Sequence, residues 1–361
     1  MVDRSSPPTR PPLSAASLTL RLAGIAVVVA ALAGAFAYVN GTLDPQRLRP
    51  KTLVNALETN NGVHPGFRRN HAKGVCVAGY FESSPEARAY SSAQVFSAAK
   101  TPVIGRFALP SGNPYAPDSS VPIRSFAVQF TQANGQQWRT GMNSMPVFPV
   151  GTPEAFYALL KAGAPDPATG KPNPSSMPAF FATHPETAAF LAWVKTAKPS
   201  ASYATETYNG INAFYLVDAD GKRQAVRWAM VPLSQDAAGD TAPAGPDFLE
   251  QDLVQRLGAG PLRWQLNMAL ANPGDSLDDA SKTWAGAHKV LNAGTLVLQS
   301  SQPQANGDCR DINFDPLILP SGIEATNDPL LAARSAAYAS SYLRRAGEVS
   351  PLHRAPQESK P

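Results

Sequence analysis

Cysteine is nearly absent from the sequence, with only Cys76 and Cys309 among 361 residues. Small secreted domains held together by disulfides, and sites in which several thiolates hold zinc or an iron–sulfur cluster, need more cysteines than this. The sequence therefore excludes both classes and leaves room for one long-range disulfide between the two cysteines.

Charge is also scarce, because Asp, Glu, Lys and Arg make up 16% of the chain against about 25% in typical soluble domains. The net charge of +4 arises in residues 1–52, which contain six basic and two acidic residues and leave 25 of each sign in the rest. A neutral folded region lacks the basic surface that nucleic acids require, so we expect no nucleic-acid partner. The 35 prolines and 26 glycines argue against a coiled coil or long helical bundle and favour a loop-rich mixed fold.

Long apolar runs are limited to residues 22–39, eighteen residues without a charge. An α-helix of this length extends roughly 27 Å, close to the hydrocarbon thickness of a bilayer. We interpret the segment as a transmembrane anchor; the alternatives are a signal peptide cleaved after Ala35-Phe36-Ala37 and a buried core helix. Basic residues are balanced on its two sides, but a short N-terminal tail usually stays in the cytoplasm. We therefore expect a membrane-anchored protein with a periplasmic or other extracytoplasmic domain, or a periplasmic protein secreted after signal cleavage.

The remaining segments differ in composition and periodicity. Residues 1–21 are rich in Ser, Pro and Thr and are predicted to be disordered, and 351–361 is predicted to be a flexible tail. Between them, alternating or β-branched runs predict an antiparallel sheet with strands at 72–82, 101–109, 125–131 and 146–150. Helices are predicted at 262–270 and 328–345. The sequence thus indicates one folded α+β domain over residues 52–350.

Candidate reactive residues are few. None of the five histidines is spaced with another histidine or a cysteine as metal ligands are, and HExxH, phosphate-loop and nucleophile-elbow motifs are absent. His71 lies at the entrance to a predicted strand, and Asn143 lies in a separate GMNSMPVF segment. Arg334 and Tyr338 are one helical turn apart, so the guanidinium can reach the phenol oxygen and favour the phenolate, a known iron ligand. Taken singly, each is more often a structural histidine, a turn asparagine or a surface Arg–Tyr pair.

Together these motifs resemble those of haem catalases. The stretch NHAKGVCVAGYFESS is similar to the strand that carries the family's essential distal histidine. It is followed, in the family's order over about residues 52–347, by TPVIGRF, VPIRSFAVQF, GMNSMPVF and FDPLILPSGIEATNDPLLAARSAAYASSYLRRAG. The resemblance implies an α+β fold, a catalase-like antiparallel β-barrel with surrounding helices, here preceded by one N-terminal transmembrane helix. It also implies bound haem, expected to be haem b.

The resemblance implies roles for individual residues. His71 is expected to be the distal acid–base residue, with Asn143 as its amide partner in catalysis. Tyr338 is the implied iron ligand, and Arg334 is expected to hold it as phenolate. Four further residues are implied as contacts of the haem propionates or of its distal face: Arg68, Arg106, Arg345 and Phe148.

The chain also departs from the family pattern. The family's distal serine, two residues after Arg106, is Ala108 here, so that hydroxyl partner of His71 is missing. A family Ser-His-Thr-Phe stretch appears as Ile211-Asn212-Ala213-Phe214, and the residues that follow Tyr338 differ. The chain ends soon after its last predicted helix, without the C-terminal helical region of full-length catalases. We therefore expect a more open haem, no bound NADPH, and a monomer or dimer.

With these departures, the chain resembles the small catalase-related peroxidases, here with a membrane anchor. We expect a haem-dependent peroxidase that reduces hydrogen peroxide or organic hydroperoxides with an organic electron donor and has limited catalase activity. Three alternatives stay open: a small true catalase, a hydroperoxide lyase or allene-oxide-type enzyme, and a non-catalytic haem-binding protein. His71 together with Asn143 argues against the last, because binding alone needs neither.

Overall fold

The computed structural model describes residues 14–39, 48–198, 200–234 and 245–348, which fall into two units, 1–49 and 50–361. The first unit contains α1 (Ala15–Val39), whose most apolar window has a mean hydropathy of 2.3. Its length and composition suit a membrane span or a signal sequence. The helix begins before the predicted span, so residues 15–21 are helical where a disordered tail was predicted, since Leu18 and Leu20 continue the apolar sequence. Residues 1–13 and the predicted tail at 351–361 lie outside the described residues.

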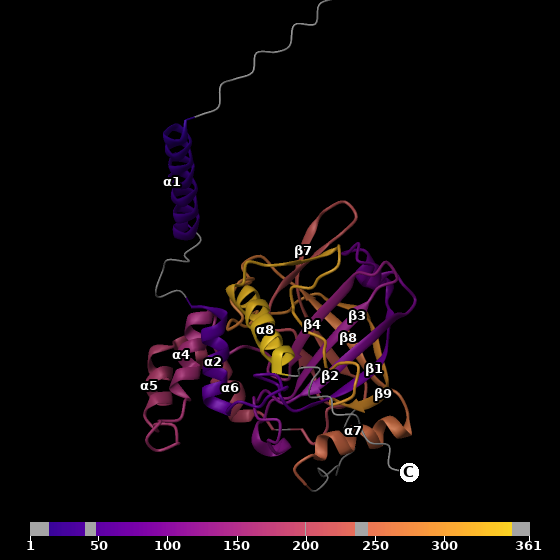
Figure 1. Ribbon diagram of the computed structural model, residues 1–361. Coiled ribbons are helices and arrows are strands. Elements are labelled where there is room, and N and C mark those ends of the chain that lie inside the picture. Colours follow the sequence, from indigo (N-terminus) through magenta and orange to yellow (C-terminus); the bar gives the residue numbers. More distant parts are fainter. Residues whose placement is uncertain (1–13, 40–47, 199, 235–244, 349–361) are drawn as a thin grey trace, which may run out of the picture. The chain divides into compact units, whose positions relative to one another are not determined.

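The second unit is built on antiparallel strands that close into a barrel (Figure 1). Eight strands pair in the closed order β7-β5-β4-β3-β2-β1-β9-β8, with β7 also paired to β8, and β6 and β10 extend the sheet beyond β7. The strands are β1 (Gly74–Ser83), β2 (Thr101–Ala108), β3 (Ser125–Thr131), β4 (Gln137–Asn143), β5 (Tyr208–Asn209), β6 (Phe214–Val217), β7 (Arg223–Pro232), β8 (Leu262–Leu270), β9 (Val290–Pro303) and β10 (Ile323–Ala325). The predicted antiparallel barrel is confirmed.

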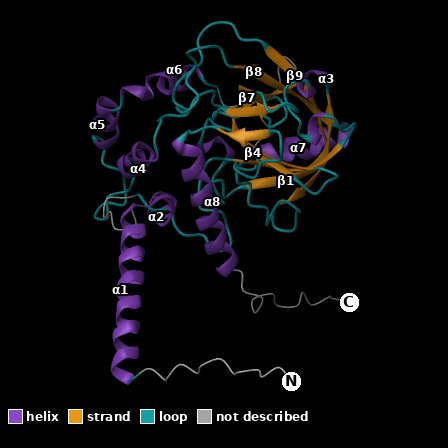
Figure 2. Ribbon diagram, turned by 90° about the horizontal axis from the view of Figure 1, so that it is seen from above, coloured by secondary structure: helices purple, strands orange, loops and turns teal. Residues whose placement is uncertain are grey.

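Helices surround this barrel. Seen from above, α8 lies between the barrel and a group formed by α2, α4, α5 and α6 (Figure 2). The α-helices are α2 (Pro50–Asn61), α3 (Pro85–Arg88), α4 (Pro153–Ala162), α5 (Ser176–Thr183), α6 (Ala188–Thr196), α7 (Phe248–Ala259) and α8 (Pro329–Glu348). Short 3₁₀ turns lie at Gln94–Phe96, Asp118–Ser120 and Pro185–Thr187.

The barrel interior is an apolar core made by every second residue of each strand. Phe107 stacks on Phe126 with ring centroids 4.2 Å apart, and Phe130 stacks on Trp138 at 4.6 Å. All four side chains are fully buried. Because successive strand residues point to opposite faces, the residues between them face out of the barrel, and those of β2–β4 line the space next to α8. The barrel is therefore filled, and any ligand space lies outside it.

Two sequence predictions in this unit were wrong. Residues 262–270 were assigned to a helix but form β8, because Leu262, Trp264, Leu266, Met268 and Leu270 alternate into the core with the period of two that a strand requires. Residues 146–150 were assigned to a strand but form irregular loop. Prolines at both 146 and 149 remove donors that a sheet ladder needs, and the strand of this region is β4 instead.

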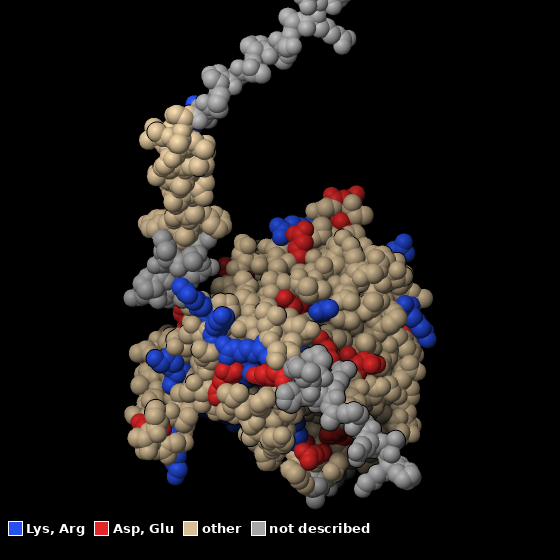
Figure 3. All heavy atoms as spheres, in the orientation of Figure 1, with Lys and Arg blue, Asp and Glu red and all other residues tan. Residues whose placement is uncertain are grey.

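Cross-links tie the outer elements together. Cys76 of β1 and Cys309 form the long-range disulfide, with Cα atoms 5.3 Å apart. Glu58 of α2 forms two ion pairs, each with a nitrogen–oxygen distance of 2.6 Å, to Arg69 and to Arg344. In Figure 3, basic and acidic side chains accordingly lie next to one another at the lower left of the domain, where α2 is found. The ion pairs join α2 to α8 and to the segment before β1, and the disulfide joins β1 to the segment after β9.

Candidate active site

A cavity of about 390 Å³ lies between the outer face of β2–β4 and the helices α2, α4 and α8. Its volume is within the range of ordinary small-ligand pockets. The structure brings all of the predicted site residues together on its walls: Arg68, His71, Arg106, Asn143, Phe148, Arg334, Tyr338 and Arg345. They come from segments up to 277 positions apart in the sequence, so their convergence is a property of the fold.

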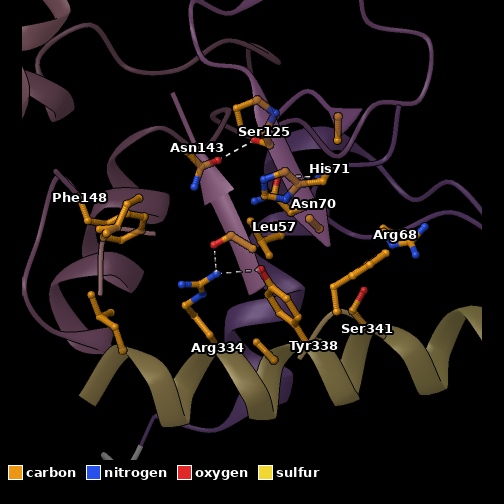
Figure 4. Close-up of a pocket in the computed structure, with 18 of the residues that line it drawn as sticks. Leu57, Arg68, Asn70, His71, Ser125, Asn143, Phe148, Arg334, Tyr338 and Ser341 are labelled. Atoms are coloured by element: carbon orange, nitrogen blue, oxygen red, sulfur yellow. Dashed lines mark hydrogen bonds between the residues drawn. The ribbon is translucent and has the colours of Figure 1, made fainter. Parts of the chain in front are cut away.

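One wall is formed by the ends of adjacent strands and the segment before β1. Asn143 is the last residue of β4, and His71 precedes β1 by three residues. Figure 4 shows both side chains on the same side of the cavity, opposite α8. Burial is the main influence on the His71 pKa and lowers it, whereas the neighbouring Asn143 side chain acts in the opposite direction and raises it.

The His71 imidazole is held neutral. Burial lowers its pKa to about 3, and the positive charges of Arg106, Arg334 and Arg68 act in the same direction. Its backbone has a φ of 57°, and Ile211, which also lines the cavity, has a φ of 61°. These are the two described non-glycine residues in the left-handed region. Such strained conformations are concentrated at functional sites, which is consistent with the position of both beside the cavity.

The opposite wall is α8. Arg334 and Tyr338 project from it into the cavity, and the Arg334 Nη2 donates to the Tyr338 phenol oxygen at 3.5 Å (Figure 4). The same Nη2 donates to the Gly141 carbonyl at 3.1 Å. A Cβ at position 141 would lie 3.1 Å from that nitrogen and 3.7 Å from the phenol oxygen, so glycine keeps this space open. The predicted one-turn contact between Arg334 and Tyr338 is present.

Arg334 is also held by two residues that the sequence did not identify as part of the site. Its Nη1 donates to Asn212 Oδ1 at 2.5 Å, and Asn212 Nδ2 donates to Asp328 Oδ2 at 2.7 Å. Burial raises the pKa of the Asp328 carboxyl, although the hydrogen bond from Asn212 opposes this rise. Asn212 was noticed only as a departure from a family motif, because its contact with α8 depends on the three-dimensional fold.

Three arginines gather at one end of the cavity. Arg68 Nη2 donates to the backbone carbonyls of Cys309, Arg310 and Ile312 at 2.9–3.1 Å. Arg345 donates to the Arg310 carbonyl as well. Arg106 donates to Gln304 at 2.5 Å, while its Nε has no hydrogen-bond partner among the described residues.

This cluster concentrates positive charge, which the charge of Asp311 offsets in part at Arg68 and Arg345. Burial lowers the pKa of Arg106 to about 10, and it lowers the pKa of Arg68 well below its usual value, with repulsion from Arg106 and Arg345 adding to the effect. Within the described parts of the chain, no carboxylate lies in ion-pair distance of the three guanidinium groups. Buried charges without partners are costly, so this end of the cavity favours a ligand that brings negative charge.

Two further lining residues complete the geometry. Phe148 lines the cavity and packs on Phe156 of α4 with ring centroids 5.4 Å apart. Ser125, which sequence reasoning missed, donates its hydroxyl to Asn143 Oδ1 at 2.6 Å. It lies within the quoted VPIRSFAVQF stretch, but no local signal marked it, since the hydrogen bond depends on strand register.

Comparison with protein families and curated relatives gives a consistent result. The family model described as catalase matches residues 44–351. The chain is 37% identical over 326 residues to a catalase-related peroxidase of Synechococcus elongatus, covering 89% of this chain and 96% of that protein. It is 32% identical over 304 residues to a catalase-related peroxidase of Mycolicibacterium paratuberculosis, covering 83% and 96%.

Solved structures show the same fold. A fungal catalase superposes with a TM-score of 0.70 at 20% identity, covering 82% of this chain and 62% of that one. A bacterial catalase gives a TM-score of 0.69 at 21% identity, covering 84% and 62%. The chain therefore shares the barrel and helices of these catalases and spans 62% of their length.

Proposed function

The chain belongs to the catalase family, and from this premise we propose that it is a haem-dependent peroxidase. It reduces hydrogen peroxide or organic hydroperoxides with a small organic electron donor, and its catalase activity is limited. The observation that carries this proposal is the opposition, across one cavity, of a neutral His71 with its Asn143 partner and of Tyr338 with Arg334.

The residues of the cavity fit a haem. Membership of the catalase family implies haem binding, and the three arginines without carboxylate partners are suited to two propionates. Gly141 and Asn143 lie two residues apart on the cavity face of β4, about 6.6 Å along the strand. Gly141 adjoins Tyr338, and Asn143 lies on the His71 side of the cavity, so the tyrosine and the histidine face different positions along this wall (Figure 4). We propose haem b, with Phe148 against the distal face.

On the proximal side, Tyr338 is the proposed iron ligand. The Arg334 guanidinium donates to its oxygen and favours the phenolate. Asn212 and Gly141 fix the guanidinium from the other side, so the arginine is held in place before any ligand binds. When bound, the haem supplies the redox-active iron at which the peroxide bond is reduced.

On the distal side, His71 transfers the proton and Asn143 orients the peroxide. A neutral imidazole accepts a proton from one peroxide oxygen and returns it to the other, so that water or an alcohol leaves. The Asn143 amide donates a hydrogen bond that orients and polarises the peroxide. One peroxide and two reduced donors thus give water, with a second water or an alcohol, and two oxidised donors.

The domain is proposed to act outside the cytoplasm. In this proposal residues 52–350 form the haem domain, and residues 22–39 are its membrane anchor or, alternatively, a signal sequence that is cleaved. Cys76 and Cys309 support this location, because structural disulfides persist in oxidising compartments.

The test uses the full chain in detergent, loaded with haem. Oxygen release and oxidation of an aromatic donor are measured with the same peroxide. Donor oxidation with little oxygen supports the peroxidase. Oxygen release without donor oxidation identifies a small catalase, hydroperoxide rearrangement without donor consumption identifies a lyase, and bound haem without turnover identifies a binding protein.

The ligand assignment is tested separately. Tyr338→Phe should abolish the phenolate-type spectrum and lower haem affinity at least about 100-fold. Replacing a residue that only supports a metal ligand can already lower metal affinity by that factor. Tyr342→Phe, one turn further along α8 and lining the same cavity, serves as the matched control. A Tyr338→Phe protein with normal haem content and an unchanged spectrum overturns the assignment.

A further inference from the structure

A single row of paired residues crosses the distal wall of the cavity. Gly74 of β1 pairs with Ala108 of β2, Ala108 pairs with Ser125 of β3, and Ser125 pairs with Asn143 of β4. Directly paired residues of antiparallel strands present their side chains on the same face, with Cβ atoms about 5 Å apart. Ala108, Ser125 and Asn143 therefore stand side by side along the cavity.

Within this row, Ser125 supplies the hydroxyl group. Its side chain is buried, with 5% of its surface exposed, and lines the cavity between the methyl group of Ala108 and the amide of Asn143. The hydroxyl donates to Asn143 Oδ1 at 2.6 Å. Among the described residues, Ser125 is the side chain that hydrogen-bonds to this amide.

This bond holds the Asn143 amide in place. A serine hydroxyl can donate or accept, so it could hold either end of the amide, and in the structure it donates to Oδ1. With Ser125 donating, the oxygen is fixed toward β3, and the amide nitrogen faces away from Ser125 into the cavity (Figure 4). That nitrogen is the donor that a bound peroxide needs.

We propose that Ser125 is a positioning residue that fixes the Asn143 amide with its N–H donors toward the ligand. The inference rests on the proposed function. The position of the family's distal serine is Ala108 here, and the hydroxyl of the distal wall comes from Ser125 on the neighbouring strand. That hydroxyl bonds to Asn143 instead of to His71.

The test is the cyanide affinity of the haem-loaded ferric full chain, a ligand equilibrium that involves no turnover. Ser125→Ala should weaken cyanide binding about five- to tenfold, the value of one orienting hydrogen bond. Ser125→Thr, which keeps the hydroxyl, should restore the affinity to within about twofold. Ser144→Ala is the matched control, because Ser144 is adjacent to Asn143 but accepts from the Arg124 backbone and does not contact the amide.

A double-mutant cycle separates positioning from a general structural effect. In an Asn143→Ala background, Ser125→Ala should produce no further loss, because its effect passes through the amide. Additive losses overturn the proposal, as does wild-type affinity in Ser125→Ala. Should Ser125→Ala fail to take up haem, Ser125→Cys, a near-isosteric weak donor, replaces it in the same cycle.

Failure of the proposed function gives a different result. If the wild-type chain neither loads haem nor reduces peroxide, the function fails. If wild type does both and Ser125→Ala matches it in cyanide affinity and in KM for peroxide, only the positioning role fails.

Discussion

The interior of the barrel and the cavity beside it share the same strands but contain different kinds of side chain. On β2, Phe107 points inward and stacks on Phe126, while its neighbours Arg106 and Ala108 point toward the cavity. The interior is filled with apolar and aromatic groups. The cavity instead holds three buried or half-buried guanidinium groups, a histidine with a strongly lowered pKa and two residues with positive φ. One face gains stability from packing, and the other gives up stability to hold groups ready for a ligand.

The largest difference between the two regions is expected when His71, the proposed proton acceptor in the cavity, is removed. His71→Ala should lower kcat/KM for peroxide by about 10²–10⁴-fold, the usual contribution of a general acid–base residue. Haem content and thermal stability should change little, because the ring faces the cavity and carries no packing of the barrel. Stopped-flow reduction of peroxide measures the first quantity, and the haem absorbance measures the second. Unchanged turnover in His71→Ala would show that another group moves the proton.

The converse change is made in the interior. Phe107→Ala removes a fully buried ring that stacks on Phe126 and on Tyr203, whose centroid is 4.9 Å away. It should cost about 3–5 kcal/mol of unfolding free energy, as for other buried aromatics cut to alanine. Denaturant unfolding of the haem-free protein gives this value. If Phe107→Ala instead kept its stability and lost only activity, the contrast between the regions would be wrong.

The disulfide joins the outer face of the barrel to a segment beside the cavity and should have an intermediate effect. Cys309 lies after β9, in a segment whose backbone carbonyls accept hydrogen bonds from Arg68 and Arg345. The bond to Cys76 ties that segment to β1. Replacing both cysteines by alanine should lower stability by about 2–4 kcal/mol and also weaken haem retention. Thermal unfolding with and without haem measures both effects. Loss of stability with unchanged haem affinity would mean that the segment holds the arginines without its cross-link.

The sequence indicated the interior through periodicity and the cavity through short motifs. β-branched or aromatic runs located β1 and β2, and alternation located β3, but β8 was assigned to a helix although its five core residues alternate from Leu262 to Leu270. β4 was missed because Gln137, Arg139, Gly141 and Asn143 give it a polar outer face, and that face forms the cavity wall. A propensity-based reading is weakest where a strand serves the site, since tertiary contacts there override local preference.

The residues of the site divide in the same way. His71, Asn143, Arg334 and Tyr338 lie in compact motifs or at a helical spacing, so sequence alone could nominate them. Asn212, Asp328 and Ser125 act through partners 18 to 122 positions away, and each contact depends on strand register or on the docking of α8. No local pattern contains that information.

The smallest expected effect concerns pH. The pKa of His71 lies at about 3 against an ordinary value of about 6.5, so the neutral base is present through the physiological range. Turnover should hold as pH falls from 8 through 6.5 and decline only as His71 begins to take up a proton below that. The sign for stability is the same, because the folded state resists protonation and loses stability as pH falls from 6.5 toward 3. A pH profile of kcat/KM measures the acid limb, and a midpoint at 6.5 would contradict the lowered pKa.

Two arginine variants sharpen this expectation, because they differ in their effect on His71. The charge of Arg106 is a main cause of the lowered histidine pKa, whereas Arg345 is not among its main causes. Both arginines line the same end of the cavity, so Arg106→Met and Arg345→Met should each weaken haem binding. Arg106→Met alone should move the acid limb to higher pH, since removing a positive neighbour favours the imidazolium. Equal movement of the limb in both variants would mean that the field of the whole arginine cluster, and not the single neighbour, holds His71 neutral.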